Sequence, residues 1–368
     1  MVGRVPGLAT LGGMPDTNWY DVLGTPDHPT LGLDTFGDVP GSDPRLHPQV
    51  LREVVTEAAL ADRLGVDYIG LGEHHRPDFA ISSPDVVLAA IAGQTERIRL
   101  GTGVTVLSSD DPVRVYERFA TLDAVSGGRA EIQLGRGSFI ESFGLFGFDL
   151  EDYETLFVEK LDLFAELQKE GPTTWQGTKR APLDGQRIYP PTAAGRLPAW
   201  VGVGGTPESV VRAARHEMPL LLAVIGGSPA RFAPFVELYR RSLTEFGMPE
   251  LPVGLHSPGH IAASDQQARD EMFPGQSENF TRIGEERGWG GPYTRRVFDA
   301  QTGPDGAIFV GAPETVATKI ASVIRLLGLS RFQLKYAVGS LSHEKRMESI
   351  RLYGEEVIPR VRELLAAG

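Results

Sequence analysis

The sequence predicts an eight-stranded parallel α/β barrel, and three observations lead to this fold class. Short apolar runs alternate with amphipathic helical stretches, which is the repeat of a parallel α/β fold. The alternation gives eight strands and eight helices, more regular repeats than a doubly wound open sheet would need. The 44 glycines among 368 residues also exceed the usual share of about 7%, as expected when many short loops carry the ligand site. We therefore expect a (β/α)₈ TIM barrel over residues 30–368, with insertions after strands 4 and 7, and an irregular N-terminal arm over residues 1–29.

The expected elements follow one another at a nearly regular spacing. The strands cover residues 30–36, 66–72, 98–106, 129–134, 199–203, 220–225, 253–263 and 332–338. The helices cover residues 48–64, 84–95, 112–125, 150–170, 207–216, 229–246, 313–327 and 343–365. Proline begins many of these helices, because its fixed φ suits the first helical position and that position needs no N–H donor.

Two longer insertions interrupt the repeat. Residues 171–198 are rich in proline, glycine and arginine, and we expect a loop or a short hairpin there, around residues 175–177. Residues 265–306 have no clean period and contain the glycine-rich strings GWGGP and QTGPDG. A long aperiodic segment at this place in a barrel is typical of a lid over the mouth.

Composition excludes several classes of function. The chain has no cysteine, so disulfides, thiolate catalysis and cysteine-ligated metal centres are excluded. The formal charge is −12 and no run of Lys or Arg occurs, which argues against binding to nucleic acid or an anionic membrane. We find neither a signal peptide nor a run near the about 20 apolar residues that a membrane helix needs. The expected location is the cytoplasm.

The string GEHH at residues 72–75 ends the second expected strand, where barrel enzymes place catalytic groups. The alternation of side chains directs His74 to the barrel mouth, above Gly70 and Gly72, which we expect to leave room for a flat ligand. Adjacent histidines point apart and the HExxH spacing is absent, so we expect no metal site. A purely structural histidine pair is the alternative interpretation.

The third and fourth expected strands also carry ligand signals. Residues 101–105 (GTGVT) place two glycines in a strand, which indicates either a bulge against something flat or a tight barrel corner. In the fourth strand Glu131, Gln133 and Gly135 alternate with apolar residues and must point into the barrel. Such a polar set needs either a ligand or a hydrogen-bond network.

Two features at the same rim of the barrel predict an anion site. Arg136 lies between two glycines, where its guanidinium suits a phosphate or a carboxylate, although a salt bridge to Glu141 or Asp149 is the alternative. After the fifth strand, residues 203–209 (VGGTPES) place two glycines before a helix whose expected N-cap is Thr206. The N–H groups at such a helix start bind phosphate.

The two features together indicate a clamp for a single phosphate, with His74 across the mouth. The string after the fifth strand is neither a Walker loop nor the GxGxxG fingerprint, so we expect one phosphate rather than a pyrophosphate.

In this combination the chain resembles the bacterial luciferase-like family of flavin-dependent monooxygenases over residues 31–362. The resemblance rests on GEHH (residues 72–75), residues 95–129, GRG (residues 135–137) followed by LFG (residues 145–147), and GGTPES (residues 204–209). It implies a (β/α)₈ barrel that binds FMN, received in reduced form from a separate flavin reductase. The implied activity is a monooxygenase that uses reduced FMN and O₂ on a small organic substrate, which the sequence does not identify.

The resemblance also implies roles for particular residues. His74 matches the family's catalytic histidine near the flavin ring, and a non-prolyl cis peptide would fall between Gly103 and Val104. The implied cofactor-binding residues are Thr102, Gly103, Val104, Gly135, Arg136, Gly204, Gly205, Thr206 and Ser209. In the luciferase α-subunit a reactive cysteine precedes the phosphate arginine, whereas Gly135 takes that place here, which argues against a luciferase.

Three alternatives stay open: an F420-dependent reductase or dehydrogenase, a flavin-binding protein without turnover, and an unrelated barrel that binds a sugar phosphate. We also expect a homodimer through the helices at residues 84–95 and 112–125. The first of these is apolar nearly all round, whereas a helix outside a barrel needs only one apolar stripe.

Overall fold

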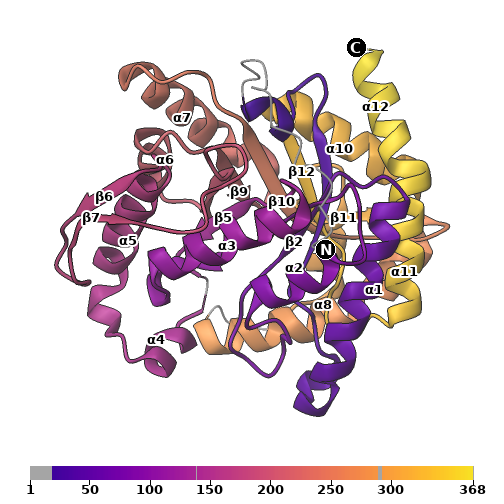
Figure 1. Cartoon of the computed structure of the whole chain (residues 1–368). Helices are drawn as coiled ribbons and strands as arrows, with labels where there is room; N and C mark the ends of the chain where they lie inside the picture. Colours follow the sequence, from indigo (N-terminus) through magenta and orange to yellow (C-terminus); the bar gives the residue numbers. More distant parts are fainter. Residues whose placement is uncertain (1–18, 138, 289–291, 368) are drawn as a thin grey trace, which may run out of the picture.

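The computed structural model describes residues 19–137, 139–288 and 292–367 (Figure 1). Its parallel strands form a sheet in the order β3-β2-β1-β12-β10-β9-β8-β5-β4. A β-bridge between Leu100 of β3 and Ala130, which lies two residues before β5, joins the two edges of this sheet and closes it into a barrel. The barrel strands are β1 (Thr30–Thr35), β2 (Tyr68–Leu71), β3 (Arg99–Thr102) with β4 (Thr105–Val106), β5 (Ile132–Gly135), β8 (Ala199–Val203), β9 (Leu220–Ala223), β10 (Val253–Ile261) and β12 (Arg331–Lys335).

Helices surround this barrel, as Figure 1 shows, and the expected fold class is confirmed. They are α1 (His47–Arg63), α2 (Pro84–Ala92), α3 (Pro112–Ser126), α5 (Tyr153–Leu167), α6 (Pro207–Arg215), α7 (Ala233–Glu245), α10 (Pro313–Leu327), α11 (His343–Leu352) and α12 (Ile358–Ala366). Helix α3 illustrates how local sequence sets the ends: the Asp111 side chain accepts from two N–H groups of the first turn, and Gly127 ends the helix at a φ of 70°.

Three smaller elements add to the expected pattern. The first insertion is an antiparallel hairpin of β6 (Pro172–Trp175) and β7 (Leu183–Arg187). A short helix, α4 (Glu141–Phe146), follows β5, and a short strand, β11 (Phe309–Gly311), pairs with β10; the sequence did not predict either. No helix in the described part of the chain is long and apolar enough to cross a membrane.

Residues 265–306, which have no clean period in the sequence, are largely helical. Most of this segment forms α8 (Asp265–Arg287) and α9 (Arg295–Thr302). Helix α8 buries few side chains, so its sequence shows no apolar stripe. It also contains Pro274 followed by Gly275, which are unusual inside a helix. A Cβ on Gly275 would lie 2.8 Å from the Val338 carbonyl oxygen, so glycine lets the helix approach the loop after β12. Residues 289–291, within the GWGGP string, and residues 1–18 of the arm lie outside the described residues.

Gly70 in β2 and Gly72 just after it do not leave room for a ligand as expected, and Gly101 in the neighbouring β3 is packed in the same way. A Cβ on Gly70 would lie 3.0 Å from the Tyr68 ring, and a Cβ on Gly101 would lie 2.5 Å from the Tyr68 hydroxyl. A Cβ on Gly72 would lie 2.2 Å from the Phe36 ring. These glycines therefore make space for two aromatic side chains of the protein itself, and the ring of Tyr68 fills the barrel interior.

A charged network fills the end of the barrel where the strands begin. Glu131 and Arg331 are both fully buried, and the Arg331 guanidinium donates to the two Glu131 oxygens at 2.6 and 3.1 Å. Arg99 donates to the same carboxylate, and so does the Trp200 Nε1–H at 3.1 Å. Of the two interpretations of the inward polar set, the hydrogen-bond network therefore applies to Glu131.

Candidate active site

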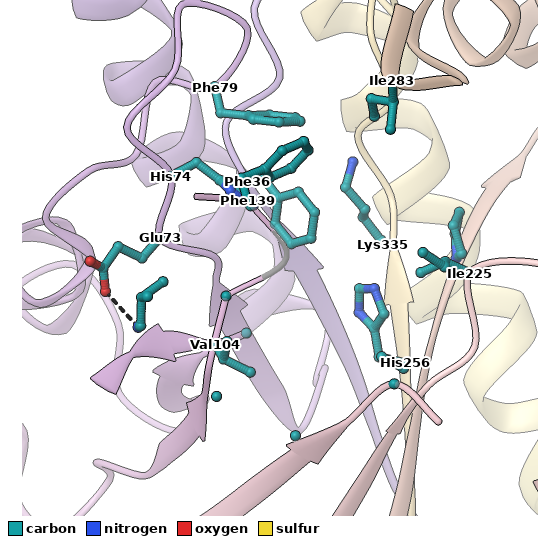
Figure 2. A pocket seen from close by; sticks show the side chains of 18 of the residues that line it. Phe36, Glu73, His74, Phe79, Val104, Phe139, Ile225, His256, Ile283 and Lys335 are labelled. Carbon is teal, nitrogen blue, oxygen red and sulfur yellow. Dashed lines mark hydrogen bonds between the residues drawn. The ribbon is translucent and has the colours of Figure 1, made fainter. Parts of the chain in front are cut away.

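A cavity of about 360 Å³ opens where the barrel strands end, and α8 lines part of it. Aromatic and aliphatic side chains form most of its wall, and α8 contributes Gln276, Asn279, Phe280, Ile283 and Arg287. Figure 2 shows His74 and the neighbouring rings on one side, and Lys335, His256 and Ile225 on the other. Six of the expected site residues line it: His74, Gly103, Val104, Gly135, Arg136 and Gly204.

The strand break between β3 and β4 places Val104 in the cavity wall. The peptide bond between Gly103 and Val104 is cis, as the resemblance implied. Glu73 holds the break in place, because its N–H donates to the Val104 carbonyl oxygen at 3.2 Å and its carboxylate accepts from the Val106 N–H at 2.9 Å. The backbone at this point is therefore fixed by a buried carboxylate that follows β2.

The side chain of Val104 leaves room only for a glycine at position 135. A Cβ at position 135 would lie 2.5 Å from Val104 Cγ2, closer than two carbon atoms approach without repulsion. We expect Gly135→Ala to lower the free energy of unfolding by about 1–3 kcal/mol, the usual cost of overpacking. Chemical denaturation measures it, and Gly144→Ala is the matched control, since a Cβ there meets no atom within 4 Å.

The additional change Val104→Ala removes the atoms that clash, so the double variant should recover most of the lost stability. A Gly135→Ala variant as stable as the wild type, or a double variant no better than the single one, would contradict this packing.

His74 differs from its neighbour His75. Its ring contacts Phe36, Phe79 and Phe139 at centroid distances of 4.7, 4.6 and 5.3 Å. Burial, aided by the positive charge of Lys335, lowers the pKa of His74 to about 3, so the imidazole is neutral near pH 7.

The ring nitrogens of His74 have no hydrogen-bond partner among residues 19–137, 139–288 and 292–367. By contrast His75 Nε2 lies 3.1 Å from Glu73 Oε1. The structural interpretation thus applies to His75, whereas His74 faces the cavity with polar atoms open to a ligand.

The clamp around Arg136 is assembled. Its Nη2 lies 3.1 Å from Thr206 Oγ1 and 3.3 Å from Ser209 Oγ. Its Nη1 lies 2.6 Å from Glu154 Oε2, so the guanidinium does form a salt bridge, but with neither of the two acids that the sequence suggested. Glu154 is half-exposed, and Arg136 keeps its two hydroxyl contacts beside that bridge.

Glu154 also joins a second arginine to the clamp. Its Oε1 accepts from Arg212 Nη2 at 2.5 Å. Burial acts to raise the pKa of Glu154, but Arg212 and Arg136 outweigh it and hold that pKa below its ordinary value. Arg212 Nη1 is buried without a hydrogen-bond partner in the described part of the chain. The sequence did not single out Glu154 or Arg212, because nothing local relates a residue of α5 to one of α6.

The start of α6 has the expected form. Thr206 is the N-cap and Pro207 the first helical residue, but the Thr206 hydroxyl donates to Ser209 Oγ at 2.8 Å and caps no N–H. Gly205 has a φ of +137°, and a Cβ on Gly204 or Gly205 would meet no atom within 4 Å. The space before the helix start is therefore open, so an anion can reach the N–H groups there.

Thr102 and Gln133 both lie in the barrel interior, but only Gln133 lines the cavity. The Thr102 hydroxyl is fully buried and bonds to the backbone of Gln133 at 3.0 and 3.1 Å, so it supports the strands and does not line the cavity. The Gln133 side chain lines the cavity, and both its amide oxygen and its amide nitrogen are buried without a partner among the described residues. A buried amide that bonds to nothing fits a ligand with its own donor and acceptor.

The residues present therefore fit a flat ring with a phosphate tail. The unpaired Gln133 amide suits the polar edge of such a ring, and the Arg136 clamp suits the phosphate. On the opposite wall, His256 and Lys335 also line the cavity. The sequence did not single them out, since they lie inside expected strands with no motif around them.

Comparison with known sequences identifies the family to which this chain is similar. A family model described as luciferase-like monooxygenase matches residues 35–331. An alkanal monooxygenase alpha chain from Photorhabdus luminescens is 28% identical over 208 residues, which cover 54% of this chain and 55% of that protein. The oxygenase component of a flavin-dependent trigonelline monooxygenase from Acinetobacter baylyi is 34% identical over 99 residues, 27% of this chain and 28% of that protein. The matched segments thus span about half or less of these curated relatives.

Comparison with solved structures gives the same fold. Monooxygenase RslO1 from Streptomyces bottropensis has a TM-score of 0.78 at 24% identity, over 90% of this chain and 99% of that one. The oxygenating constituent of 3,6-diketocamphane monooxygenase from Pseudomonas putida, solved with FMN, has a TM-score of 0.74 at 18% identity, with the same coverage. An F420-dependent secondary alcohol dehydrogenase, solved with an F420-acetone adduct, has a TM-score of 0.71 at 15% identity, also over 90% and 99%.

Proposed function

Because this chain belongs to the luciferase-like monooxygenase family, we propose that it is a monooxygenase that uses reduced FMN and O₂ on a small organic substrate. A separate flavin reductase would supply the reduced FMN, as the description of one relative as an oxygenase component suggests. The observation that carries the proposal is the clamp of Arg136, Thr206 and Ser209 at the edge of an aromatic-walled cavity.

The geometry of the cavity supports a set of residues that would hold FMN. Arg136, the two hydroxyls and the open start of α6 would bind its phosphate. Val104 would pack against the ring system and the Gln133 amide would bond to its polar edge. Reduced FMN, when bound, supplies the two electrons with which O₂ is reduced, so that one oxygen atom enters the substrate and the other leaves as water.

The protein's own contribution is proton management and the exclusion of water. His74 is neutral, so its ring can accept a hydrogen bond at one nitrogen and donate a hydrogen bond from the other. The rings of Phe36, Phe79 and Phe139 surround it and keep water away. Helix α8, which lies within the segment that the sequence suggested as a lid, contributes Phe280 and Ile283 to the cavity wall.

Anaerobic titration of the purified full-length protein with reduced FMN, reduced riboflavin and reduced F420 tests the proposal. We expect tight binding of reduced FMN, weaker binding of riboflavin, which lacks the phosphate, and no binding of F420. Binding of F420 without FMN would replace the proposal by a deazaflavin oxidoreductase, and binding of none of the three would overturn it altogether.

We expect the variant His74→Asn to bind reduced FMN normally. The rate at which O₂ then oxidises the bound flavin should change by at least about 10-fold, since positioned acid–base groups contribute about 10²–10⁴-fold to rates. Stopped-flow absorbance measures this rate. His75→Asn is the matched control, because His75 faces Glu73 and not the open cavity beside the clamp. Equal rates in both variants and the wild type would remove His74 from the proposed mechanism.

We also propose a homodimer through α2 and α3. Val86 on α2 and Val125 on α3 are 64% and 66% exposed, and Ala89 and Ala90 beside Val86 are exposed as well. Helices α2 and α3 pack against each other, so these apolar side chains lie on neighbouring elements. A second copy of the chain would cover them.

A further inference from the structure

Asp34 and His256 form a buried pair in the cavity wall. Asp34 lies on β1 and is fully buried, and His256 lies on β10 and is nearly so. The two are joined by a contact of 2.6 Å between His256 Nδ1 and Asp34 Oδ2. Asp34 Oδ1 has no hydrogen-bond partner among the described residues, so the imidazole is the group that Asp34 holds.

The contact fixes which nitrogen of His256 faces the cavity. An ionised carboxylate accepts a hydrogen bond from Nδ1–H, and this leaves the lone pair on Nε2. Figure 2 shows the His256 ring at the cavity wall, on the side away from Val104. A proton that arrives at Nε2 creates an imidazolium whose charge the Asp34 carboxylate stabilises, which is the role of the acid in any Asp–His pair.

Lys335, Asp38 and Glu73, three other ionisable groups of the cavity wall, are engaged with other partners. Lys335 donates to both oxygens of Asp38, at 2.8 and 3.1 Å, and Glu73 bonds to His75 and to the Val106 N–H. The charged or titratable side chains that line the cavity besides His256 are Asp38, Glu73, His74, Arg136, Tyr153, Arg287 and Lys335. Among these, His74 is the other histidine; burial lowers its pKa, and no carboxylate in the described part of the chain hydrogen-bonds to its ring.

The wall near His256 suits a flat ring. The Phe36 ring lies nearly parallel to the imidazole, at 15° and a centroid distance of 6.1 Å, and it also contacts His74 and Phe79. Aromatic rings with a centroid separation of 4.5–7 Å attract one another, so an aromatic ligand gains contacts on this side of the cavity.

We propose that the substrate is a hydroxylated aromatic molecule, a phenol, whose hydroxyl donates its proton to Nε2 of His256. The O–H bond breaks, its electron pair stays on the oxygen, and the proton forms the new N–H bond, so the reaction needs no further reagent. The phenolate ring is richer in electrons and therefore a better acceptor of an oxygen atom, and this later oxygen transfer rests on the proposed function. His256 is then a catalytic residue and Asp34 a positioning residue.

The test uses para-nitrophenol, whose ionised form is yellow, and the full-length protein without flavin. Absorbance titration of the bound probe should show its ionisation at a pH about one unit below that of the free probe, equivalent to a 10-fold shift of the equilibrium. His256→Gln and Asp34→Asn should each remove this shift, and His74→Gln, the other histidine of the same cavity, should keep it. Melting temperatures check that each variant is folded.

The proposal fails if the probe does not bind, if it ionises as in free solution, or if both His256→Gln and Asp34→Asn behave as the wild type. Either variant is sufficient if the other does not fold. The result is separate from the FMN titration, because no flavin is present. If the ionisation of the bound probe shifts in a way that depends on His256, but the protein binds no flavin, the phenol site is retained and the proposed monooxygenase function is rejected.

Discussion

Replacing Arg136 with alanine should lower the affinity for FMN by on the order of 100-fold and leave the affinity for riboflavin nearly unchanged. Truncating one partner of a hydrogen-bonded charge pair costs about 2–5 kcal/mol, and about 2.8 kcal/mol corresponds to about 100-fold. The loss should be confined to FMN because the guanidinium contacts Thr206 and Ser209 at the clamp, where only the phosphate would lie.

Fluorescence titration with the two flavins measures the ratio of their affinities in each variant. Arg215→Ala is the matched control, since this arginine is also on α6 but is exposed and lies over Phe246. An equal loss for FMN and riboflavin in Arg136→Ala would mean that Arg136 supports the fold through Glu154 and does not bind the phosphate.

The clamp could be predicted because each half of it is contiguous in the sequence. A glycine-flanked arginine after one strand and a Gly-Gly-Thr-Pro helix start after the next strand share the same rim of any parallel barrel. The eight strands were predictable for a similar reason, since strand and helix periods are local properties. All eight expected strands are present, although Gly103 and Val104 divide the third one into β3 and β4.

The features that the sequence did not predict depend on which distant residues meet. Asp34 and His256 are 222 positions apart, and only the closing of β1, β12 and β10 side by side brings them into contact. Glycines were equally ambiguous, since a strand glycine makes space for whatever faces it. For Gly72 this is the Phe36 ring, and for Gly135 it is the Val104 side chain. Helix α8 shows a third limit, because tertiary contacts and not an apolar stripe stabilise it.

The buried network at the other end of the barrel should give the largest change in stability. Burial acts to raise the pKa of Glu131, but the charges of Arg331 and Arg99 outweigh it and hold that pKa at about 2, below the ordinary value of 4.5. The ionised carboxylate thus contributes stability above about pH 4.5, and this contribution is lost as the pH falls towards 2. We expect Glu131→Gln to lower the free energy of unfolding by about 3–5 kcal/mol near pH 7, because it leaves buried guanidinium charge uncompensated.

Urea denaturation of both proteins near pH 7 and near pH 3 separates this charge effect from a loss of packing. The difference between wild type and Glu131→Gln should shrink at the lower pH, since pH 3 lies below the ordinary pKa of 4.5, where the unfolded wild type takes up a proton and part of the carboxylate's contribution to stability is lost. Adding Arg331→Met removes the uncompensated charge, so the double variant should be more stable than Glu131→Gln. The control Glu348→Gln breaks an exposed pair with Arg351 and should cost less than about 1 kcal/mol. A constant difference at both pH values would mean that Glu131 acts through shape and hydrogen bonding, and that its charge does not stabilise the barrel.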